Sequence, residues 1–199
     1  MKDILLTILR NKNTNTTDFR KVADDLALLL ANETAHCLKK QKISVQTPLA
    51  KTAGYKIKNN IALVPILRAG LALLPAFLKT FPESSVGFIG LKRDEKTYEA
   101  KLYYKNIPKI STRDNVIILD PMLATGGSLV EAIKILMTAG AKEENIIYIG
   151  VVSAPEGLAN LKKHFPKIQT IIAAHDQKLN KNKYILPGLG DFGDRYFKT

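Results

Sequence analysis

The sequence has few of the features of a secreted, disulfide-bonded or membrane-embedded protein. Its 199 residues include a single cysteine, Cys37, which cannot form an internal disulfide. No apolar run approaches the roughly 18 residues that a membrane-spanning helix requires. The first ten residues carry an early acid and no small-residue cleavage site, unlike a secretory signal. These absences predict a soluble protein of a reducing compartment, and we expect it in the cytoplasm, without a membrane partner.

Two common kinds of ligand site are also missing. The three histidines lie far apart, without metal-ligand spacing, so we expect no structural metal held by the protein alone. No glycine motif has the spacing of nucleoside-triphosphate loops or of dinucleotide-binding folds. Positive charge is abundant: 30 basic residues stand against 18 acidic ones, a net charge of +12. Because the lysines are dispersed, we interpret them as a solvated surface, with RNA binding as the minority interpretation.

From residue 60 onward, short apolar runs alternate with helical stretches. Continuous apolar runs are typical of parallel strands buried on both faces. These runs occupy residues 61–67, 86–91, 116–119, 146–152 and 168–174. Helical spacing of apolar residues appears at residues 16–30, 71–79 and 129–137. The pattern predicts one α/β domain over residues 1–199, a parallel sheet flanked by helices, with ligands at the carboxyl ends of the strands.

Two segments depart from this alternation. Residues 1–60 are predicted to form N-terminal helices and then a polar connection from residue 39 onward, in which Ile43 and Val45 could make a short strand. Residues 92–108 are highly charged, with weak alternation, and this composition favours a protruding hairpin arm over a core strand.

The stretch at residues 116–128 is an apolar run that ends at Asp120, turns through small residues and begins a helix. Pro121 cannot donate to a sheet ladder, so the strand ends before it. A helix N-terminus presents unpaired N–H groups and the positive end of the helix dipole, and two glycines here would let an anion approach closely. An acid beside a phosphate indicates a phosphorylated sugar. The alternative is an ordinary strand–turn–helix connection capped by Thr125 or Ser128.

Two arginines follow other predicted strands. Arg68 comes directly after the run at residues 61–67, where its guanidinium could grip phosphate oxygens in pairs. The alternative for Arg68 is a helix-start arginine paired with a surface acid. Arg93 follows the run at residues 86–91 and offers another positive group at the same edge, or else a solvated charge in the charged arm.

Five motifs together resemble one known family. They read V-P-I-L-R-A-G, G-L-K-R-D, L-D-P-M-L-A-T-G-G-S, A-P-E-G and Y-I-L-P-G-L-G-D-F-G-D-R-Y-F. In this order and spacing they resemble the uracil phosphoribosyltransferases, a branch of the type I phosphoribosyltransferase superfamily, over nearly the whole chain from about Leu5. Most of the superfamily carries a second acid before the loop, where this chain and the uracil branch have proline. The resemblance implies a type I phosphoribosyltransferase-like fold with a C-terminal base-binding hood at residues 175–199.

The resemblance also implies an activity and its residues. The implied reaction transfers the 5-phosphoribosyl group from 5-phospho-α-D-ribose 1-diphosphate (PRPP) to uracil, giving UMP and diphosphate in pyrimidine salvage. The implied PRPP-binding residues are Arg68, Arg93, Asp120, Pro121, Met122, Leu123, Ala124, Thr125, Gly126, Gly127, Ser128 and Asp191. The implied uracil-binding residues are Ile185, Gly190, Asp191 and Phe192. Catalytic roles are implied for Asp120, Arg68 and Asp191. Phe192 stands where many members have alanine, so it either shapes the pocket or packs outside it.

The cofactor and partners follow from the same resemblance. Mg²⁺ is expected, bound mainly through the donor and water, because this ion prefers oxygen ligands and retains waters. GTP is a candidate effector, since some members of the family respond to it. The apolar faces of the arm and of the N-terminal helix predict a homodimer or a higher even oligomer. Two alternatives remain: an RNA-binding regulator with the same fold, and a transferase for a purine base. The complete donor loop and the C-terminal motif favour the uracil enzyme, and nucleic-acid binding is not expected.

Overall fold

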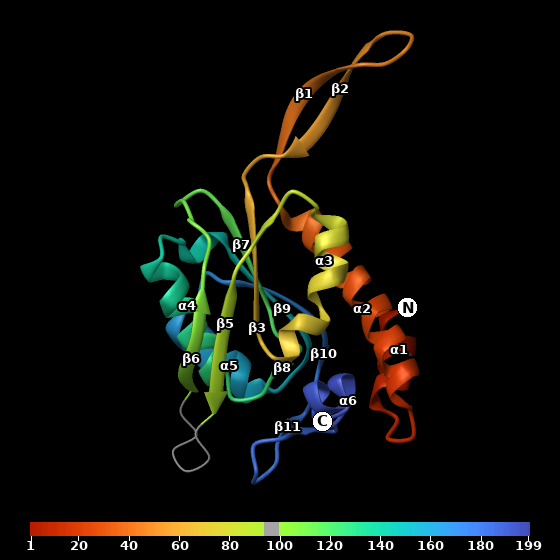
Figure 1. The fold of residues 1–199 in the computed structure, drawn as a ribbon, viewed down its shortest axis with the longest axis vertical. Helices are drawn as coiled ribbons and strands as arrows, with labels where there is room; N and C mark the ends of the chain where they lie inside the picture. The colour runs from red at the N-terminus through yellow and green to blue at the C-terminus, as the bar shows by residue number, and fades with distance from the viewer. Residues whose placement is uncertain (94–99) are drawn as a thin grey trace.

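A computed structural model describes residues 1–93 and 100–199 of the chain. Its centre is a sheet with the strand order β10-β9-β7-β3-β5-β6, between a layer formed by α1, α2 and α3 and a layer formed by α4 and α5 (Figure 1). Neighbouring strands from β10 to β5 are parallel, and β6 pairs antiparallel with β5 at the edge.

The elements in chain order are α1 (Lys2–Arg10), α2 (Thr16–Cys37), β1 (Lys40–Gln46), β2 (Lys51–Ile57), β3 (Ile61–Leu67), the 3-10 helix η1 (Ala69–Ala72), α3 (Leu74–Thr80), β4 (Ser85–Val86), β5 (Phe88–Arg93), β6 (Ala100–Asn106), β7 (Asn115–Leu119), β8 (Met122–Leu123), α4 (Gly127–Thr138), the 3-10 helix η2 (Glu143–Asn145), β9 (Ile146–Ser153), α5 (Pro155–His164), β10 (Gln169–His175), β11 (Lys178–Leu179), β12 (Ile185–Leu186) and α6 (Phe192–Phe197).

Strand β3 shows why the central strands read as unbroken apolar runs. Successive side chains of a strand point to opposite faces of the sheet. Ile61 and Leu63 pack into the core beneath α1, α2 and α3, whereas Ala62 and Val64 pack into the core beneath α4 and α5. Both faces therefore require apolar residues, and the predicted parallel sheet between helical layers is confirmed.

Helix α2 illustrates both the strength and the error of the helix prediction. Asn15 caps its first turn by accepting a hydrogen bond from the Asp18 N–H group at 2.9 Å. The helix continues to Cys37, beyond the predicted end at residue 30, because Ala31 and Thr34 extend its buried stripe. The Thr34 hydroxyl is buried without penalty, since it donates to the Leu30 carbonyl at 2.8 Å.

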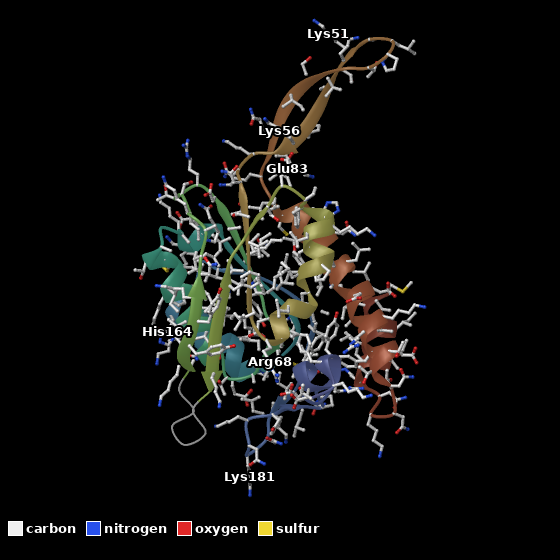
Figure 2. The ribbon with its side chains drawn as sticks, viewed as in Figure 1. Lys51, Lys56, Arg68, Glu83, His164 and Lys181 are labelled. Carbon is white, nitrogen blue, oxygen red and sulfur yellow. The ribbon has the colours of Figure 1, made fainter. Side chains whose placement is uncertain are left out.

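After residue 39 the chain is not an irregular connection, and the short strand expected at Ile43 and Val45 is confirmed as part of β1. The segment forms an antiparallel hairpin of β1 and β2 that projects from the end of the molecule opposite to Arg68 (Figures 1 and 2). Ile43 lies opposite Gly54, whose missing side chain leaves room for Val45. Every residue of β1 and β2 is half-buried or exposed, so no strong alternation of apolar residues marks these strands.

Part of the charged segment at residues 92–108 lies at the edge of the central sheet. Strand β6 pairs antiparallel with β5, and most of its residues are exposed, as the edge of a sheet allows. The predicted arm also includes residues 94–99, which lie outside the described residues, as does the side chain of Arg93.

Candidate active site

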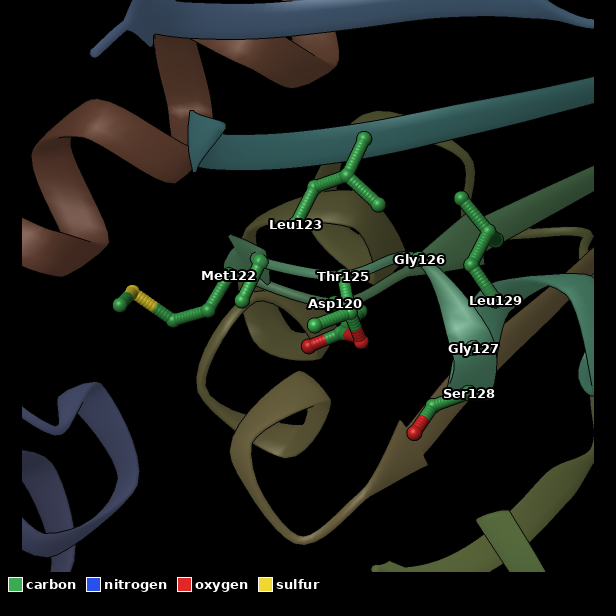
Figure 3. A pocket seen from close by; sticks show the side chains of 9 residues that line it. Asp120, Met122, Leu123, Thr125, Gly126, Gly127, Ser128 and Leu129 are labelled. Atoms are coloured by element: carbon green, nitrogen blue, oxygen red, sulfur yellow. The ribbon is translucent and has the colours of Figure 1, made fainter. Parts of the chain in front are cut away.

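A pocket opens at Asp120, directly after the end of β7 (Figure 3). Its empty volume is about 460 Å³, part of it open to solvent. It is lined by Asp120, Met122, Leu123, Ala124, Thr125, Gly126, Gly127, Ser128 and Leu129. The acid and the small-residue loop that the sequence predicts to act together therefore share one pocket.

Main-chain contacts with β9 fix the start of this loop. The Asp120 N–H group donates to the Ile149 carbonyl at 3.1 Å, and the Pro121 carbonyl accepts from Val151 and Val152 at 2.9 and 3.0 Å. The short strand β8 then continues the parallel pairing with β9. One side chain adds to these contacts, since the buried Tyr148 hydroxyl donates to the Asp120 carbonyl at 2.7 Å.

The loop then leads into α4, and the N-terminus of this helix lies at the pocket. Gly126 occupies the N-cap of α4 with φ of +78°, and a glycine there has no side chain to cap the helix. A Cβ atom at Gly126 would lie 2.9 Å from the Gly157 carbonyl oxygen, so the turn has space only for glycine. The first-turn N–H groups and the helix dipole can therefore meet an anion directly.

Burial raises the pKa of Asp120 to about 7, although a hydrogen bond from the Met122 N–H group lowers it in part. The carboxyl group is thus poised between its neutral and charged forms at neutral pH. A positive charge beside it would favour the carboxylate. Such a group can both hold sugar hydroxyls and respond to a developing cation. Burial also raises the pKa of Tyr148 well above its usual value, with the charge of Asp120 adding to the effect, so the Tyr148 hydroxyl remains a donor.

Arg68 lies directly after β3, at the same edge of the sheet (Figure 2). Its side chain is 61% exposed, and it lies 3.8 Å from the carboxylate of Asp194, which is 55% exposed. An ion pair this exposed contributes little to stability. The pairing with a surface acid is therefore present, but it leaves the guanidinium available to an anionic ligand.

The C-terminal segment packs beside Arg68. Helix α6 approaches η1 closely, since a Cβ atom at Gly193 would lie 3.6 Å from the Cβ of Ala69. Asp191 caps α6 by accepting from the Asp194 N–H group at 2.9 Å, and it remains exposed. The structure thus brings Asp191, Arg68 and the Asp120 pocket to one edge of the sheet.

The predicted uracil-binding residues have different environments. Gly190 is exposed with φ of +82°, and Ile185 is 5% exposed in β12. The side chain of Phe192 is fully buried, with its ring 5.2 Å from that of Phe19 in an edge-on contact. Of the two expectations for Phe192, the structure supports packing outside the pocket, and only its main chain remains to meet a ligand.

The polar residues near the site that were not predicted include Arg10, Tyr148 and Asp176. Asp176 had a usable signal, because it lies two residues after the predicted strand at residues 168–174 and directly after the observed β10. Tyr148 had none, since an aromatic residue inside an apolar strand reads as core. The expected place of Arg93 at the site stays a prediction.

Comparisons with known proteins agree on one family. The family model described as "Uracil phosphoribosyltransferase" matches residues 2–199. A curated uracil phosphoribosyltransferase from Malacoplasma penetrans is 46% identical over 98% of this chain and 93% of its own length. The solved structure of the AQ2163 protein from Aquifex aeolicus superposes with a TM-score of 0.90 at 33% identity, over 98% of this chain and 93% of that chain.

A purine phosphoribosyltransferase from Pyrococcus horikoshii superposes less closely. Its TM-score is 0.52 at 16% identity, over 78% of this chain and 84% of that chain, and this similarity shows a common fold alone. The strand order, the Asp120 pocket and the match over residues 2–199 lead to one conclusion. The chain has the type I phosphoribosyltransferase fold and belongs to the uracil phosphoribosyltransferase family.

Proposed function

We propose that this protein is a pentosyl-transfer enzyme of pyrimidine salvage, which moves the 5-phosphoribosyl group of PRPP to uracil and releases UMP and diphosphate. The observation that carries the proposal is the pocket in which Asp120 lies beside the N-terminus of α4, whose N-cap is a glycine. A carboxylate next to N–H groups that can bind an anion suits a phosphorylated sugar. The family match over residues 2–199 supports uracil as the base that accepts the phosphoribosyl group.

The chemistry assigns different tasks to the two halves of the donor. Loss of diphosphate from the anomeric carbon builds positive charge on the ribose and negative charge on the leaving group, so electrostatic stabilisation is effective. In the proposal, the N–H groups of residues 126–128 bind the 5′-phosphate and Asp120 holds the ribose hydroxyls. The carboxylate of Asp120 also offsets the developing cation. Arg68 and Arg93 bind the diphosphate, and Asp191 faces the donor from the C-terminal side.

Mg²⁺ is the proposed cofactor, held mainly by donor oxygens and water. Among the described residues, no group of three or more histidine, cysteine or acidic side chains could hold a metal. The pocket instead offers the single carboxylate of Asp120. This fits an ion that commonly binds one or two carboxylates together with substrate phosphates. When bound, Mg²⁺ supplies neutralisation of the diphosphate charge.

The base is proposed to lie against the loop at residues 185–192. Its uracil-facing groups are those of Ile185, Gly190, Asp191 and the main chain of Phe192. Uracil presents a carbonyl acceptor beside an N–H donor, and cytosine reverses both. Each unpaired buried polar group costs about 1–3 kcal/mol, so the two mismatches should reject cytosine by roughly a hundredfold.

The proposed assembly is a homodimer or a higher even oligomer. Exposed apolar groups on β6 support it, since Leu102 is 44% exposed and Tyr103 57%. The apolar face of the helix predicted at residues 16–30 packs instead into the core of its own chain, where Phe19 and Leu26 are fully buried. On α1, Ile4 is 62% exposed and adds to the apolar surface. Burial of such groups between copies removes apolar surface from water. Light scattering should show a dimer or a multiple of it, and a monomer at micromolar concentration would contradict the proposal.

The cytoplasm is the proposed location, and GTP is the proposed effector to test. No helix in residues 1–93 or 100–199 has the length and apolar character to span a membrane. If GTP is an effector, it should change the initial rate of UMP formation. Equal rates with and without GTP at every PRPP concentration would exclude this role.

The activity is tested by incubating the protein with radiolabelled uracil, PRPP and Mg²⁺, then separating UMP from uracil. We expect UMP to form only when all three are present. Parallel reactions with cytosine and hypoxanthine test the base. Absence of labelled UMP, or equal use of hypoxanthine, would refute the proposed function.

A further inference from the structure

Two charged residues from distant parts of the chain meet behind the loop at residues 187–190. Arg10 ends α1, and Asp176 directly follows β10. The Arg10 guanidinium donates to both carboxylate oxygens of Asp176, from Nη1 to Oδ2 at 3.0 Å and from Nη2 to Oδ1 at 2.5 Å. Only 3% of the Asp176 side chain is exposed, against 25% of the Arg10 side chain. The pair is therefore bidentate and largely withdrawn from water.

This pair holds both polar groups of Gly188. The Gly188 N–H group donates to Asp176 Oδ2 at 3.0 Å, and the Gly188 carbonyl accepts from Arg10 Nη1 at 2.7 Å. Gly188 has φ of +64°, and a Cβ atom there would lie 2.2 Å from the Ile185 carbonyl oxygen. Position 188 therefore has no room for a side chain that could hold the loop. The orientation of the Gly188 main chain is set instead by its hydrogen bonds to Arg10 and Asp176.

A second arginine ties the following residue to the same helix end. Arg195 Nη1 donates to the carbonyls of Leu189, at 2.7 Å, and Leu9. Its Nη2 atom donates to the Asn11 carbonyl at 2.8 Å. The C-terminal end of α1, the loop and α6 thus form one hydrogen-bonded unit.

An acid at the end of a parallel strand could also serve as a direct ligand group. Asp176 does not fit that role, because its side chain is almost fully buried and both oxygens already accept hydrogen bonds from Arg10. Nor is stability a sufficient reason for the pair, since buried ion pairs contribute little more than apolar residues of similar size. What distinguishes a bidentate ion pair from apolar packing is its geometry, because the two parallel hydrogen bonds fix the orientation of both partners.

We propose that Arg10 and Asp176 are positioning residues that set the main-chain geometry of the base loop and thereby control uracil affinity and selectivity. The inference rests on the proposed assignment of residues 185–192 to uracil. Main-chain groups that recognise a flat base by hydrogen bonds must be held within a fraction of an ångström of their binding positions. Gly188 and Gly190 have no side chains to fix their own orientation, and the charged pair behind Gly188 provides that constraint by binding both of its main-chain polar groups.

The test compares Arg10→Gln, Asp176→Asn and the double variant with the unmodified enzyme. Each single variant should raise the KM for uracil about tenfold or more while the KM for PRPP stays within about twofold. Each should also melt at a lower temperature, because the remaining charge is buried without its partner. The double variant should regain much of the melting temperature but keep the high KM for uracil. Discrimination against cytosine should fall in all three.

Lys2→Gln is the matched control on the same helix. Lys2 pairs with Glu33 at 2.6 Å, in a more exposed setting and away from the loop. This variant should leave both KM values and the cytosine discrimination unchanged.

Amide hydrogen exchange supplies a readout that needs no activity. The variants should exchange faster at residues 188–190 and at an unchanged rate at residues 120–128. Unchanged exchange at residues 188–190 would overturn the positioning role, whether or not the protein makes UMP. Parallel changes in both KM values, restored together with the melting temperature in the double variant, would overturn it in favour of a purely structural role. Failure of the unmodified protein to make UMP would instead refute the proposed function.

Discussion

The two loops at the carboxyl edge of the sheet are held in different ways. The loop at residues 120–128 is fixed mainly by main-chain pairing with β9 and by a glycine turn. The loop at residues 187–190 is fixed by the charged side chains of Arg10, Asp176 and Arg195. The first loop extends the sheet, whereas the second lies beyond the sheet and depends on distant parts of the chain.

This difference separates two kinds of sensitivity. Changes in the first loop should act on the donor and on the chemical step, because its main chain and Asp120 form the anion pocket. Changes around the second loop should act on the base, because they move groups proposed to read uracil. The following variants test that separation in order of decreasing effect.

The largest effect is expected from Asp120→Asn. The substitution keeps the shape of the side chain but removes a charge needed as the ribose becomes cationic, so kcat should fall at least about a hundredfold. The KM for uracil should stay within about twofold. Steady-state rates with both substrates measure this, and near-normal turnover of the folded variant would exclude the assigned role.

The same variant should change the pH dependence of stability. The pKa of Asp120 is raised from 3.8 to about 7, so between these values the native protein binds more protons than the unfolded chain. The free energy of unfolding of the unmodified protein should therefore fall as the pH rises through this window and level off above pH 7. The Asp120→Asn variant has no carboxyl group at this position and so does not lose stability in this way. At pH 8 it should be more stable than the unmodified protein by on the order of 1–2 kcal/mol. Thermal melts at pH 5 and pH 8 measure the difference, and equal shifts at both values would contradict it.

Arg68→Ala should have the next largest effect. Loss of a guanidinium from the donor's leaving group should raise the KM for PRPP about tenfold or more, with the KM for uracil within about twofold. Arg113→Ala, at another exposed arginine, is the control. Equal loss of affinity for both substrates would indicate that Arg68 acts through the structure of the edge as a whole.

Gly126→Ala should weaken the donor loop. The new Cβ atom would meet the Gly157 carbonyl oxygen at 2.9 Å in a conformation with φ of +78°, so unfolding should become easier by about 1–2 kcal/mol. The KM for PRPP should rise several-fold while base discrimination stays unchanged. For stability, Gly127→Ala is the control, because a Cβ atom there makes only an ordinary contact, 3.8 Å from Thr125 Oγ1. Equal destabilisation by the two substitutions would contradict the steric argument.

The smallest effect is expected from Tyr148→Phe, which removes only the hydroxyl that contacts the Asp120 carbonyl. The free energy of unfolding should fall by about 1 kcal/mol, and kcat a few-fold, because the main chain around Asp120 is also held by β9. Uracil selectivity should be unaffected, in contrast with the Asp176→Asn variant. A changed ratio of uracil to cytosine use in Tyr148→Phe would show that the two loops are not independent.

The site could be predicted from sequence to the extent that its parts lie close along the chain. Asp120, the glycine turn and the start of α4 fall within 13 consecutive residues, and each carries a local signal: an acid after an apolar run, a turn residue, a helical period. The central sheet was predictable for the same reason, since burial on both faces of a strand such as β3 dictates an unbroken apolar run. Of the β1–β2 hairpin only a short strand at Ile43 and Val45 was expected, because both strands are solvated and lack that signal.

The sequence by itself determined the α/β architecture, the strand ends that carry Arg68 and Asp120, and the family. Only the tertiary structure decided that Phe192 packs against Phe19 and that Arg10 and Asp176 hold Gly188. Arg10 and Asp176 are 166 residues apart, and no local pattern links an arginine at a helix end to an acid after a strand. Their partnership exists because the fold brings the residue after β10 to the last residue of α1. The Asp176 side chain is only 3% exposed there, and the bidentate ion pair leaves neither charge without a partner.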